Sequence, residues 1–415
     1  MENLPNDLLS KILFLVPCDS VLNCKLVCKT WKTLISHRQV ISILFSLGTE
    51  SEMDCMNELY YGYYEEIKGT TKEEFNYRTS LKKINHPPMN RRDHVDSIVG
   101  CCNGLVCFIV PHDHVDDPVY ICNPITGEYV NLPELNAEVG LIVGGFGYLR
   151  SANVYKVIRI HYPSRVYFSD VQLSAGSVQI YTFGDCGGGG GYRRSIGETS
   201  YSLTFQGTLV NGSLYWLDNK DWKIVSFNLS DEEFSLLPTV PPCLLQEDPG
   251  KNTMYRMKVL QGNLCLVHLQ LGEHVNIWSY KDNLAKQNER DNPSLGWSLE
   301  FSIPYSCKAY HEPFAVTKHN EVLLWYGYTR LCCYDSSTKT LSKIVDEDGD
   351  LTNSFCAIPH ISSMVSLKAL GVNSKKHRYY SCQNETTDDK QPQLVVPKLI
   401  GSANDDQVAG VTTTI

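Results

Sequence analysis

The sequence of 415 residues lacks long hydrophobic runs: nowhere do about 18 consecutive apolar residues occur, so no membrane-spanning helix is expected. The N-terminus also lacks the basic and then apolar layout of a signal peptide. A basic face is missing, because 46 acidic residues outnumber 37 basic ones and give a net charge of −9. Nucleic acid and anionic membranes are therefore poor candidates for the main partner. We expect a soluble chain of the cytoplasm, the nucleus or both.

Motifs of catalysis are equally scarce. The chain has no nucleophile elbow, no dinucleotide-binding turn and no H-E-x-x-H zinc motif. The glycine-rich run at 185–194 lacks the Lys-Ser/Thr pair of a phosphate loop, and the acidic residues at 346–350 lack the spacing of an EF-hand. A metal could use the His and Asp side chains at 112–117, but a solvated hairpin tip is the favoured interpretation. We predict no metal, no cofactor and no catalytic activity.

Paired cysteine motifs are absent too, although cysteine itself is abundant. None of the 16 cysteines forms a C-x-x-C pair; they lie in apolar runs, as Cys107 does, or beside one another, as Cys101 and Cys102 do. Cys24 and Cys28 are one helical turn apart, but no His or second pair lies nearby to complete a zinc site. We predict free cysteines that behave as small buried hydrophobic residues.

Residues 4–35 carry a dense helical pattern. Pro5 can begin a first helix, whose apolar residues recur three and four positions apart in two adjacent rows that end at Val16. Pro17 ends this helix, a second follows, and a third covers 27–35. Eighteen of these 32 residues are apolar, which is more than so small a unit can bury. A partner should cover the remainder; the alternative is a helical hairpin that packs only on its own chain.

The order and spacing of these residues resemble the F-box. The matching segments are Leu4-Pro5, Asp7-Leu8-Leu9, Ile12-Leu13, Val16-Pro17, Val27-Cys28-Lys29 and 31–35. Asn23 and Cys24 depart from the family, which usually has a basic and an aromatic residue there. The resemblance implies that the helices bind a Skp-type adaptor, which links them to the cullin of a ubiquitin ligase. The adaptor-binding residues that it implies are Leu4, Pro5, Leu8, Leu9, Ile12, Leu13, Val27, Cys28, Trp31, Leu34 and Ile35.

The next segment, 39–95, has no clean period. The run VISILFSL at 40–47 could prolong the helices or begin a strand, and the tyrosine-rich, acidic stretch at 50–77 fits neither pattern. We predict a linker that packs on both neighbouring domains, of which the first is the adaptor-binding domain at 1–38.

From Asp96 to about Leu370, short alternating apolar runs are bounded by Gly, Asn, Asp or Pro, as is typical of β-strands. Asn-Gly pairs predict hairpin turns. The runs group into units of roughly 40 to 50 residues with about four strands each, which is the pattern of propeller blades. A sixth unit is expected if 360–370 pairs with strands before Asp96 and closes the ring. The five visible units begin near residues 97, 143, 203, 254 and 313.

These units resemble the F-box-associated domain of plant F-box proteins, a kelch-like β-propeller module. The resemblance rests on CCNGLVCF, YICNPITGEYVNLP, GGFGYLRSANVYKVIRI, LVNGSLYWL, FNLSDEEF and SSMVSL, in that order. The family often has Asp where Leu149 and Val154 stand. The resemblance implies a scaffold that holds a protein destined for ubiquitination, and it leaves the substrate-binding residues unknown.

The predicted fold class is α+β with several domains. A three-helix F-box at 1–38 precedes an all-β, kelch-like propeller of about six blades at 96–370, and a polar, disordered tail follows at 371–415. The predicted function is substrate recognition in an Skp-cullin-F-box ubiquitin ligase, with a target protein recruited by the propeller for ubiquitination and proteasomal degradation. One alternative is a propeller that senses a small ligand or a glycan; a propeller enzyme is a third option.

Overall fold

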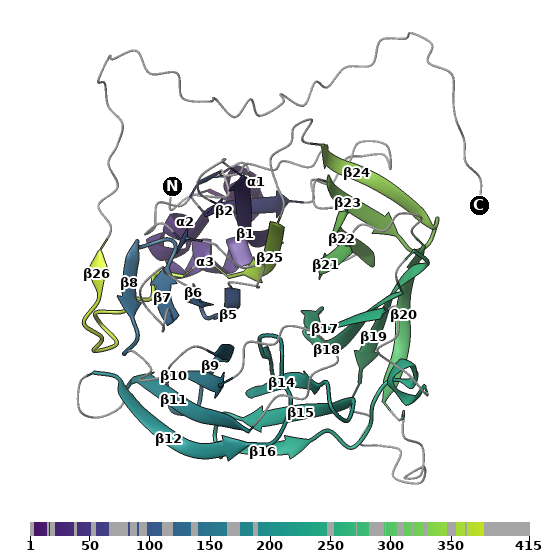
Figure 1. Ribbon diagram of the computed structural model, residues 1–415. Coiled ribbons are helices and arrows are strands. Elements are labelled where there is room, and N and C mark those ends of the chain that lie inside the picture. The colour runs from purple at the N-terminus through teal and green to yellow at the C-terminus, as the bar shows by residue number, and fades with distance from the viewer. Residues whose placement is uncertain are drawn as a thin grey trace. The chain divides into compact units, whose positions relative to one another are not determined.

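The chain begins with three short helices and continues as antiparallel sheets (Figure 1). This order confirms the predicted combination of a helical segment with an all-β domain. The structure is a computed structural model, and it describes residues 4–14, 16, 21–36, 40–50, 55–65, 82–83, 89–90, 98–109, 119–133, 140–163, 175–185, 190–246, 253–270, 272–281, 294, 296–304, 311–317, 319–326, 330–346, 354–361 and 363–376.

The three helices pack around a small core. They are α1 (Asn6–Phe14), α2 (Val21–Val27) and α3 (Lys29–Ser36). Leu9 and Leu13 lie one helical turn apart on α1 and are buried, because both lie on the same side of the helix. The partly buried residues that pack against this pair are Val16, Cys24, Trp31 and Leu34.

The described strands form six antiparallel sheets, of which five are blades with four strands that follow one another along the chain. We number these blades 1 to 5 in chain order. Blades 1 and 2 contain β5 (Ile98–Cys102), β6 (Leu105–Ile109), β7 (Val119–Asn123), β8 (Glu128–Asn131), then β9 (Leu141–Leu149), β10 (Val154–Tyr162), β11 (Gly176–Gly184) and β12 (Tyr192–Thr199). Blade 3 contains β13 (Thr208–Val210), β14 (Ser213–Asp218), β15 (Lys223–Asn228) and β16 (Glu233–Leu236). Blades 4 and 5 contain β17 (Thr253–Leu260), β18 (Asn263–Gln270), β19 (His274–Tyr280), β20 (Trp297–Pro304), then β21 (His311–Val316), β22 (Glu321–Tyr326), β23 (Arg330–Asp335) and β24 (Thr340–Asp346).

Tight hairpin turns join the first two strands of several blades. Both central residues have a positive φ at Asn103-Gly104, between β5 and β6, and at Asn211-Gly212, between β13 and β14. This is the type I′ geometry, whose twist matches that of the flanking strands. The hairpins predicted from the Asn-Gly pairs are therefore confirmed.

The sixth sheet joins the two ends of the propeller, and we call it the closing sheet. Its strand β25 lies antiparallel to β1, with Ser42 opposite His360 and Gly48 opposite Ser354. The structure therefore has five blades of four consecutive strands, not about six, and the sixth sheet combines strands from both ends of the propeller. Its strands are β1 (Val40–Glu50), β2 (Cys55–Glu65), β3 (Lys82–Lys83), β4 (Met89–Asn90) and β25 (Ser354–His360).

The closing sheet differs from the sequence expectation at both of its ends. Strand β25 ends at His360, so the pairing segment precedes 360–370 instead of coinciding with it. Within 39–95, which we expected to be a linker, the stretches 40–50 and 55–65 are strands. The run VISILFSL is apolar at odd and even positions alike, so its period could not separate helix from strand. Pairing with β2 on one side and β25 on the other makes it a strand.

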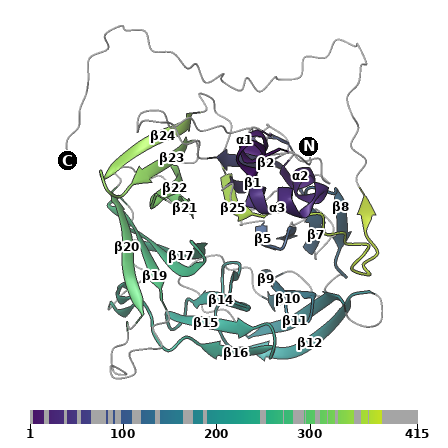
Figure 2. The same ribbon diagram turned by 180° about the vertical axis from the view of Figure 1, so that it is seen from behind.

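The innermost strands of neighbouring sheets contact one another in a closed cycle. β5 contacts β9, β9 contacts β13, β13 contacts β17, β17 contacts β21, β21 contacts β25, and β25 contacts β5. Figures 1 and 2 show the sheets arranged around this cycle from opposite sides. Because β25 is held by β1 within its own sheet, the cycle joins the beginning of the propeller to its end.

After β25 the chain crosses blade 1 as a strap, which we define as residues 361–376. The side-chain amide of Asn123 donates hydrogen bonds to the carbonyls of Ser363, at 3.0 Å, and Val365, at 2.7 Å. Asn123 itself is fully buried, so both bonds replace the water that its amide would otherwise contact.

The second half of the strap is part of the packed structure. Leu367 and Val372 are buried in a core cluster that blades 1 and 2 share. The short strand β26 (Lys375–Lys376) then pairs with β8. The described residues of the strap thus extend beyond 370, where we expected a disordered tail to begin; residues 377–415 lie outside the described part of the chain.

The blade cores contain aromatic stacks and cysteines. The ring of Tyr155 stacks between those of Phe146 and Phe183, with centroids 5.9 Å and 5.1 Å apart. Burial raises the pKa of the Cys122 thiol to about 12, so it stays protonated at neutral pH. The prediction of buried cysteines is wrong for Cys28, which is exposed, and Cys24, Cys101 and Cys102 are half-buried. The free and buried cysteines, which confirm the predicted role as small hydrophobic residues, are Cys107, Cys122, Cys243, Cys265, Cys332 and Cys333.

Candidate functional site

The first candidate site consists of exposed apolar residues on α1 and α2. Leu8 and Ile12 lie one helical turn apart on α1 and are 48% and 42% exposed, and Leu4, just before the helix, is 36% exposed. Leu26 and Val27 at the end of α2 are 63% and 61% exposed. We call these five residues the apolar helix surface. Large hydrophobic side chains exposed together in so short a segment indicate a surface for another protein.

The structure divides the predicted adaptor-binding residues into two groups. Leu9 and Leu13 form the core of the helical segment, and the half-buried Trp31 and Leu34 pack against them. The side chain of Ile35 lies outside the described part of the chain. The exposed residues of the set are Leu4, Pro5, Leu8, Ile12, Val27 and Cys28.

Sequence reasoning could not make this division, because both rows of α1 are apolar. One row is needed for the core between the helices, and the other remains for a partner. Leu26 was missed altogether, although it belongs to the same apolar stretch as Val27 and is the more exposed of the two. Its position directly before a predicted site residue was the available signal.

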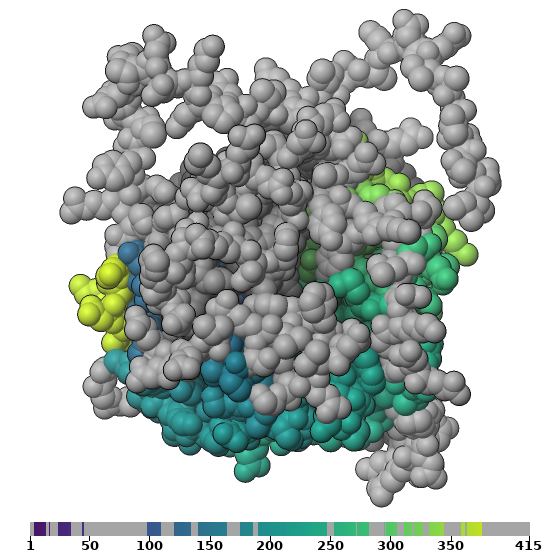
Figure 3. Space-filling model, viewed as in Figure 1, coloured from purple at the N-terminus to yellow at the C-terminus, as the bar shows by residue number. Residues whose placement is uncertain are grey.

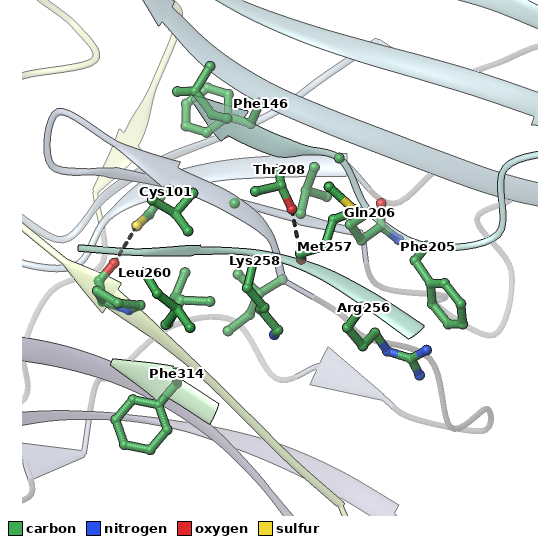
Figure 4. Close-up of a pocket in the computed structure, with 18 of the residues that line it drawn as sticks. Cys101, Phe146, Phe205, Gln206, Thr208, Arg256, Met257, Lys258, Leu260 and Phe314 are labelled. Carbon is green, nitrogen blue, oxygen red and sulfur yellow. Dashed lines mark hydrogen bonds between the residues drawn. The ribbon is translucent and has the colours of Figure 1, made fainter. Parts of the chain in front are cut away.

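The second candidate site is a cavity at the axis of the propeller, with a volume of about 440 Å³ (Figure 4). Most of its lining residues lie on the innermost strands, namely β5, β9, β13, β17, β21 and β25, and the others come from 205–207, from β14 and from the turn at 261–262. Small-molecule sites in proteins typically have volumes of about 300–1,000 Å³. In Figure 4, Phe146 and Phe314 lie on opposite sides of the strand that carries Arg256 and Lys258. We call this space the axial cavity.

Hydrogen bonds around the axial cavity connect one inner strand to the next. The hydroxyl of Thr208 on β13 donates to the carbonyl of Met257 on β17 at 2.9 Å. The thiol of Cys101 on β5 donates to the carbonyl of Pro359 on β25 at 2.8 Å. Both bonds appear as dashed lines in Figure 4. These two bonds hold neighbouring inner strands together at two places in the cavity wall.

Two cationic side chains of β17 line the cavity. The ammonium group of Lys258 forms an ion pair with the carboxylate of Glu312 on β21. The guanidinium carbon of Arg256 lies 3.5 Å from the ring centroid of Phe205, which is a cation–π contact. One of its nitrogens donates to the carbonyl of Tyr255 at 3.0 Å.

Two outer strands of the propeller are mostly exposed. Strand β12 of blade 2 and strand β16 of blade 3 consist mostly of exposed residues. In the space-filling view of Figure 3, the teal and green atoms of blades 2 to 4 form the lower and right-hand surface. By contrast Trp216, Trp297 and Trp325 are buried, as predicted for tryptophans of the blade cores.

The loops considered for metal or phosphate binding add no site. The loop at 112–117 lies outside the described residues, as do 186–189 and 347–350. In the part of the chain that is described, no three His, Cys, Asp or Glu residues are grouped as metal ligands would be. No described helix has the length and apolar character that crossing a membrane requires.

Both regions match known protein families. Residues 67–349 match the F-box associated beta propeller domain family, and residues 1–42 match the F-box domain. The helices and the propeller together thus define a protein class in which an F-box precedes a β-propeller. The chain belongs to the family of F-box proteins with an F-box-associated β-propeller domain, and both predicted resemblances are confirmed.

Proteins of a plant are similar to this chain over most of its length. The chain is 28% identical over 325 residues to an F-box protein of Arabidopsis thaliana, with 73% of each chain covered. It is 25% identical over 322 residues to an F-box/kelch-repeat protein of the same plant, covering 73% of this chain and 80% of the relative. A putative F-box/kelch-repeat protein of Arabidopsis thaliana is 23% identical over 384 residues, which cover 82% of this chain and 86% of the relative.

Proposed function

We propose that this chain is the substrate receptor of a ubiquitin ligase of the Skp-cullin-F-box type. Its helices bind a Skp-type adaptor and, through it, a cullin, while its propeller binds the protein to be ubiquitinated and degraded by the proteasome. The complex acts in the cytoplasm or the nucleus. The observation that carries the proposal is the apolar helix surface on a segment that matches the F-box domain.

The receptor holds the target protein near the ubiquitin-charged enzyme and takes no part in the chemical step. A target held beside a ubiquitin-charged enzyme experiences a high effective concentration of the reactive thioester, as any tethered reactant does. The catalytic groups belong to the other subunits of the complex. The chain itself therefore needs two binding surfaces at a fixed separation, and no catalytic residue.

Burial of the apolar helix surface supplies the affinity for the adaptor. Complete burial of a large apolar side chain contributes about 1.5–3 kcal/mol. The five side chains are between 36% and 63% exposed, so each can gain about 1 kcal/mol when the adaptor covers it. Because the gain is spread over several residues, removing one side chain weakens binding only modestly, and a decisive test must alter two.

The test is a calorimetric titration of the full chain with a purified Skp-type adaptor. The variant carries Leu8→Asp and Ile12→Asp, which place two carboxylates on the apolar helix surface, and we expect affinity to fall at least about a hundredfold. The matched control is Lys11→Asp, an exposed residue of the same helix, for which we expect a change within about twofold. Circular dichroism verifies that the helices remain folded.

An equal loss of affinity in both variants would mean that charge, and not the apolar surface, decides adaptor binding. Unchanged affinity in the double variant would remove the helices from the interface. Either result contradicts the proposal.

A further inference from the structure

We infer that the axial cavity is a binding site for a small organic anion with an apolar body, such as an aromatic carboxylate or sulfonate. The inference concerns the cavity alone and does not rest on the proposed role in ubiquitination. It follows from the charge of the lining residues, from their hydrogen-bonding groups and from the apolar walls.

The charged residues among those that line the cavity are both cations. Arg256 and Lys258 are two positions apart on β17, so their side chains leave the same face of the strand. No carboxylate belongs to the described lining residues. Glu312 of β21, which is not among the lining residues, forms an ion pair with Lys258. The charge of the lining therefore favours an anion.

The side-chain groups of the lining are mainly hydrogen-bond donors. A guanidinium group carries five N–H donors and an ammonium group three, and neither can accept. The side-chain oxygen of Gln206 already accepts a hydrogen bond of 2.6 Å from the amide of Gly144, so the NH₂ group at the other end of this amide is a further donor. Carboxylates and sulfonates only accept hydrogen bonds, and they form stronger ones with charged donors than neutral groups do.

The walls beside these donors are apolar and require an organic body. Phe146, Met257, Leu260 and Phe314 are buried and line the cavity from β9, β17 and β21. An inorganic anion would leave this surface in contact with water, whereas an aromatic or aliphatic body would cover it. A ligand with an anionic group and an apolar body can contact both the donors and the apolar residues of the lining.

The cation at the cavity is held in place before any ligand arrives. Stacking on Phe205 and the bond to the Tyr255 carbonyl restrain the guanidinium group of Arg256. A restrained donor loses little conformational entropy when a ligand binds, so more of the interaction energy appears as affinity.

The test uses fluorescence titration of the full chain with anilinonaphthalene sulfonate, an anion with an apolar aromatic body. Phenylnaphthylamine, which has the same rings but no sulfonate, is the matched neutral probe. We expect one sulfonate probe to bind per chain and to raise the melting temperature, since it binds the folded state. Arg256→Met should lower the affinity for the sulfonate probe about tenfold and leave the affinity for the neutral probe unchanged.

The control variant is Arg193→Met on the exposed strand β12, which should change neither affinity. A second variant combines Lys258→Met with Glu312→Gln, because removing the lysine alone would leave a buried carboxylate without its partner. This double variant should also lower the affinity for the sulfonate probe. It provides the test if Arg256→Met does not fold.

Equal affinity for the two probes, or equal sulfonate affinity in the wild-type chain and both cavity variants, would overturn the inference. So would sulfonate binding that lowers the melting temperature, because the probe would then bind unfolded chains. Adaptor affinity should be the same in all these variants. Failure of this inference would therefore not affect the proposed receptor function. Failure of the receptor proposal would likewise not affect this inference.

Discussion

The imidazole of His268 lies inside blade 4, stacked on the ring of Tyr255 with centroids 4.9 Å apart. The residue is 2% exposed, and among the described residues neither ring nitrogen has a hydrogen-bond partner. Burial lowers its pKa to about 4, because charging the ring would require a cation to exist away from water. His360 in the closing sheet is also buried, and burial lowers its pKa to about 4 as well.

These histidines make stability depend on pH in a definite direction. In the unfolded chain a histidine titrates near pH 6.5. Because the folded pKa is lower, the unfolded state binds more protons between about pH 6.5 and pH 4, and the free energy of unfolding falls as the pH falls through this window. The stabilisation is fully present above about pH 6.5. For each residue the difference in pKa corresponds to about 3 kcal/mol.

His268→Phe should remove part of this dependence. Phenylalanine fills a similar space, can stack on Tyr255 and has no polar atom that needs a partner. We expect the free energy of unfolding to rise by about 1–3 kcal/mol at pH 7, and by more at pH 5, in urea denaturation. The matched control is His274→Phe on β19, an exposed histidine of the same blade, which should change the free energy of unfolding at pH 7 by no more than about 0.5 kcal/mol. An identical pH profile for wild type and His268→Phe would contradict this account.

Local chemistry made some of these residues predictable and left others hidden. Asn103-Gly104 and Asn211-Gly212 predicted their turns because few residues tolerate a positive φ twice in succession. The division of α1 between Leu9 in the core and Leu8 at the surface was hidden, since it depends on which neighbour covers each row. The buried state of His268 was hidden for the same reason.

At the scale of elements, the strap meets blade 1 at the turn between β5 and β6. The hydroxyl of Ser363 donates to the carbonyl of Asn103 at 3.0 Å. A Cβ atom added at Gly104 would lie 1.8 Å from the Ser363 hydroxyl oxygen, which is far inside the contact distance. Gly104 therefore serves two purposes: its φ of +85° suits the turn, and its missing side chain lets the strap approach.

Gly104→Ala compared with Gly212→Ala separates these purposes. Gly212 has a similar φ of +81° in an equivalent turn, but nothing lies within 4 Å of an added Cβ. Both substitutions incur the cost of a positive φ, whereas only the first displaces the strap. We expect Gly104→Ala to lower the free energy of unfolding by about 1–3 kcal/mol more than Gly212→Ala in urea denaturation.

The rescue variant for this comparison adds Ser363→Gly to Gly104→Ala. Removing the serine side chain takes away the colliding oxygen and should recover part of the extra loss. Equal effects of the two single alanine substitutions would mean that the strap adjusts freely at this turn.

The pairing between elements was only partly visible in the sequence. Strands within a blade are neighbours along the chain, so their order followed from the alternation and the turns. The pairing of β1 with β25 joins segments about 300 residues apart, and no local pattern at Leu44 or Ile358 specifies its partner. The sequence suggested a returning strand but placed it a few residues too late, at 360–370.

For the whole molecule, the position of β1 decides how the chain can be divided. The last helix ends at Ser36 and β1 begins at Val40, so removal of residues 1–38 leaves the closing sheet intact. We expect this shortened chain to keep its melting temperature and to bind its target, but no longer to co-precipitate with the adaptor. When it is present in excess in cells, the half-life of the target should lengthen.

The matched control removes residues 1–50 and so deletes β1 as well as the helices. It should melt at a lower temperature and aggregate, because the inner strand β25 then loses its partner within the sheet. If both shortened chains are equally stable, β1 is not needed for closure. If target turnover is unchanged by excess of the first one, the receptor proposal fails.

The closing sheet also sets an order of events during synthesis. About 300 residues separate the end of β1 at Glu50 from the start of β25 at Ser354. A ribosome that adds about 5–20 residues each second needs about 15–60 s to cover this distance. Throughout that time the helices are complete, whereas β1 lacks its partner β25 and the ring of the propeller is not closed. Under the proposed function, the nascent chain therefore completes its adaptor-binding helices before its propeller can close and bind a target.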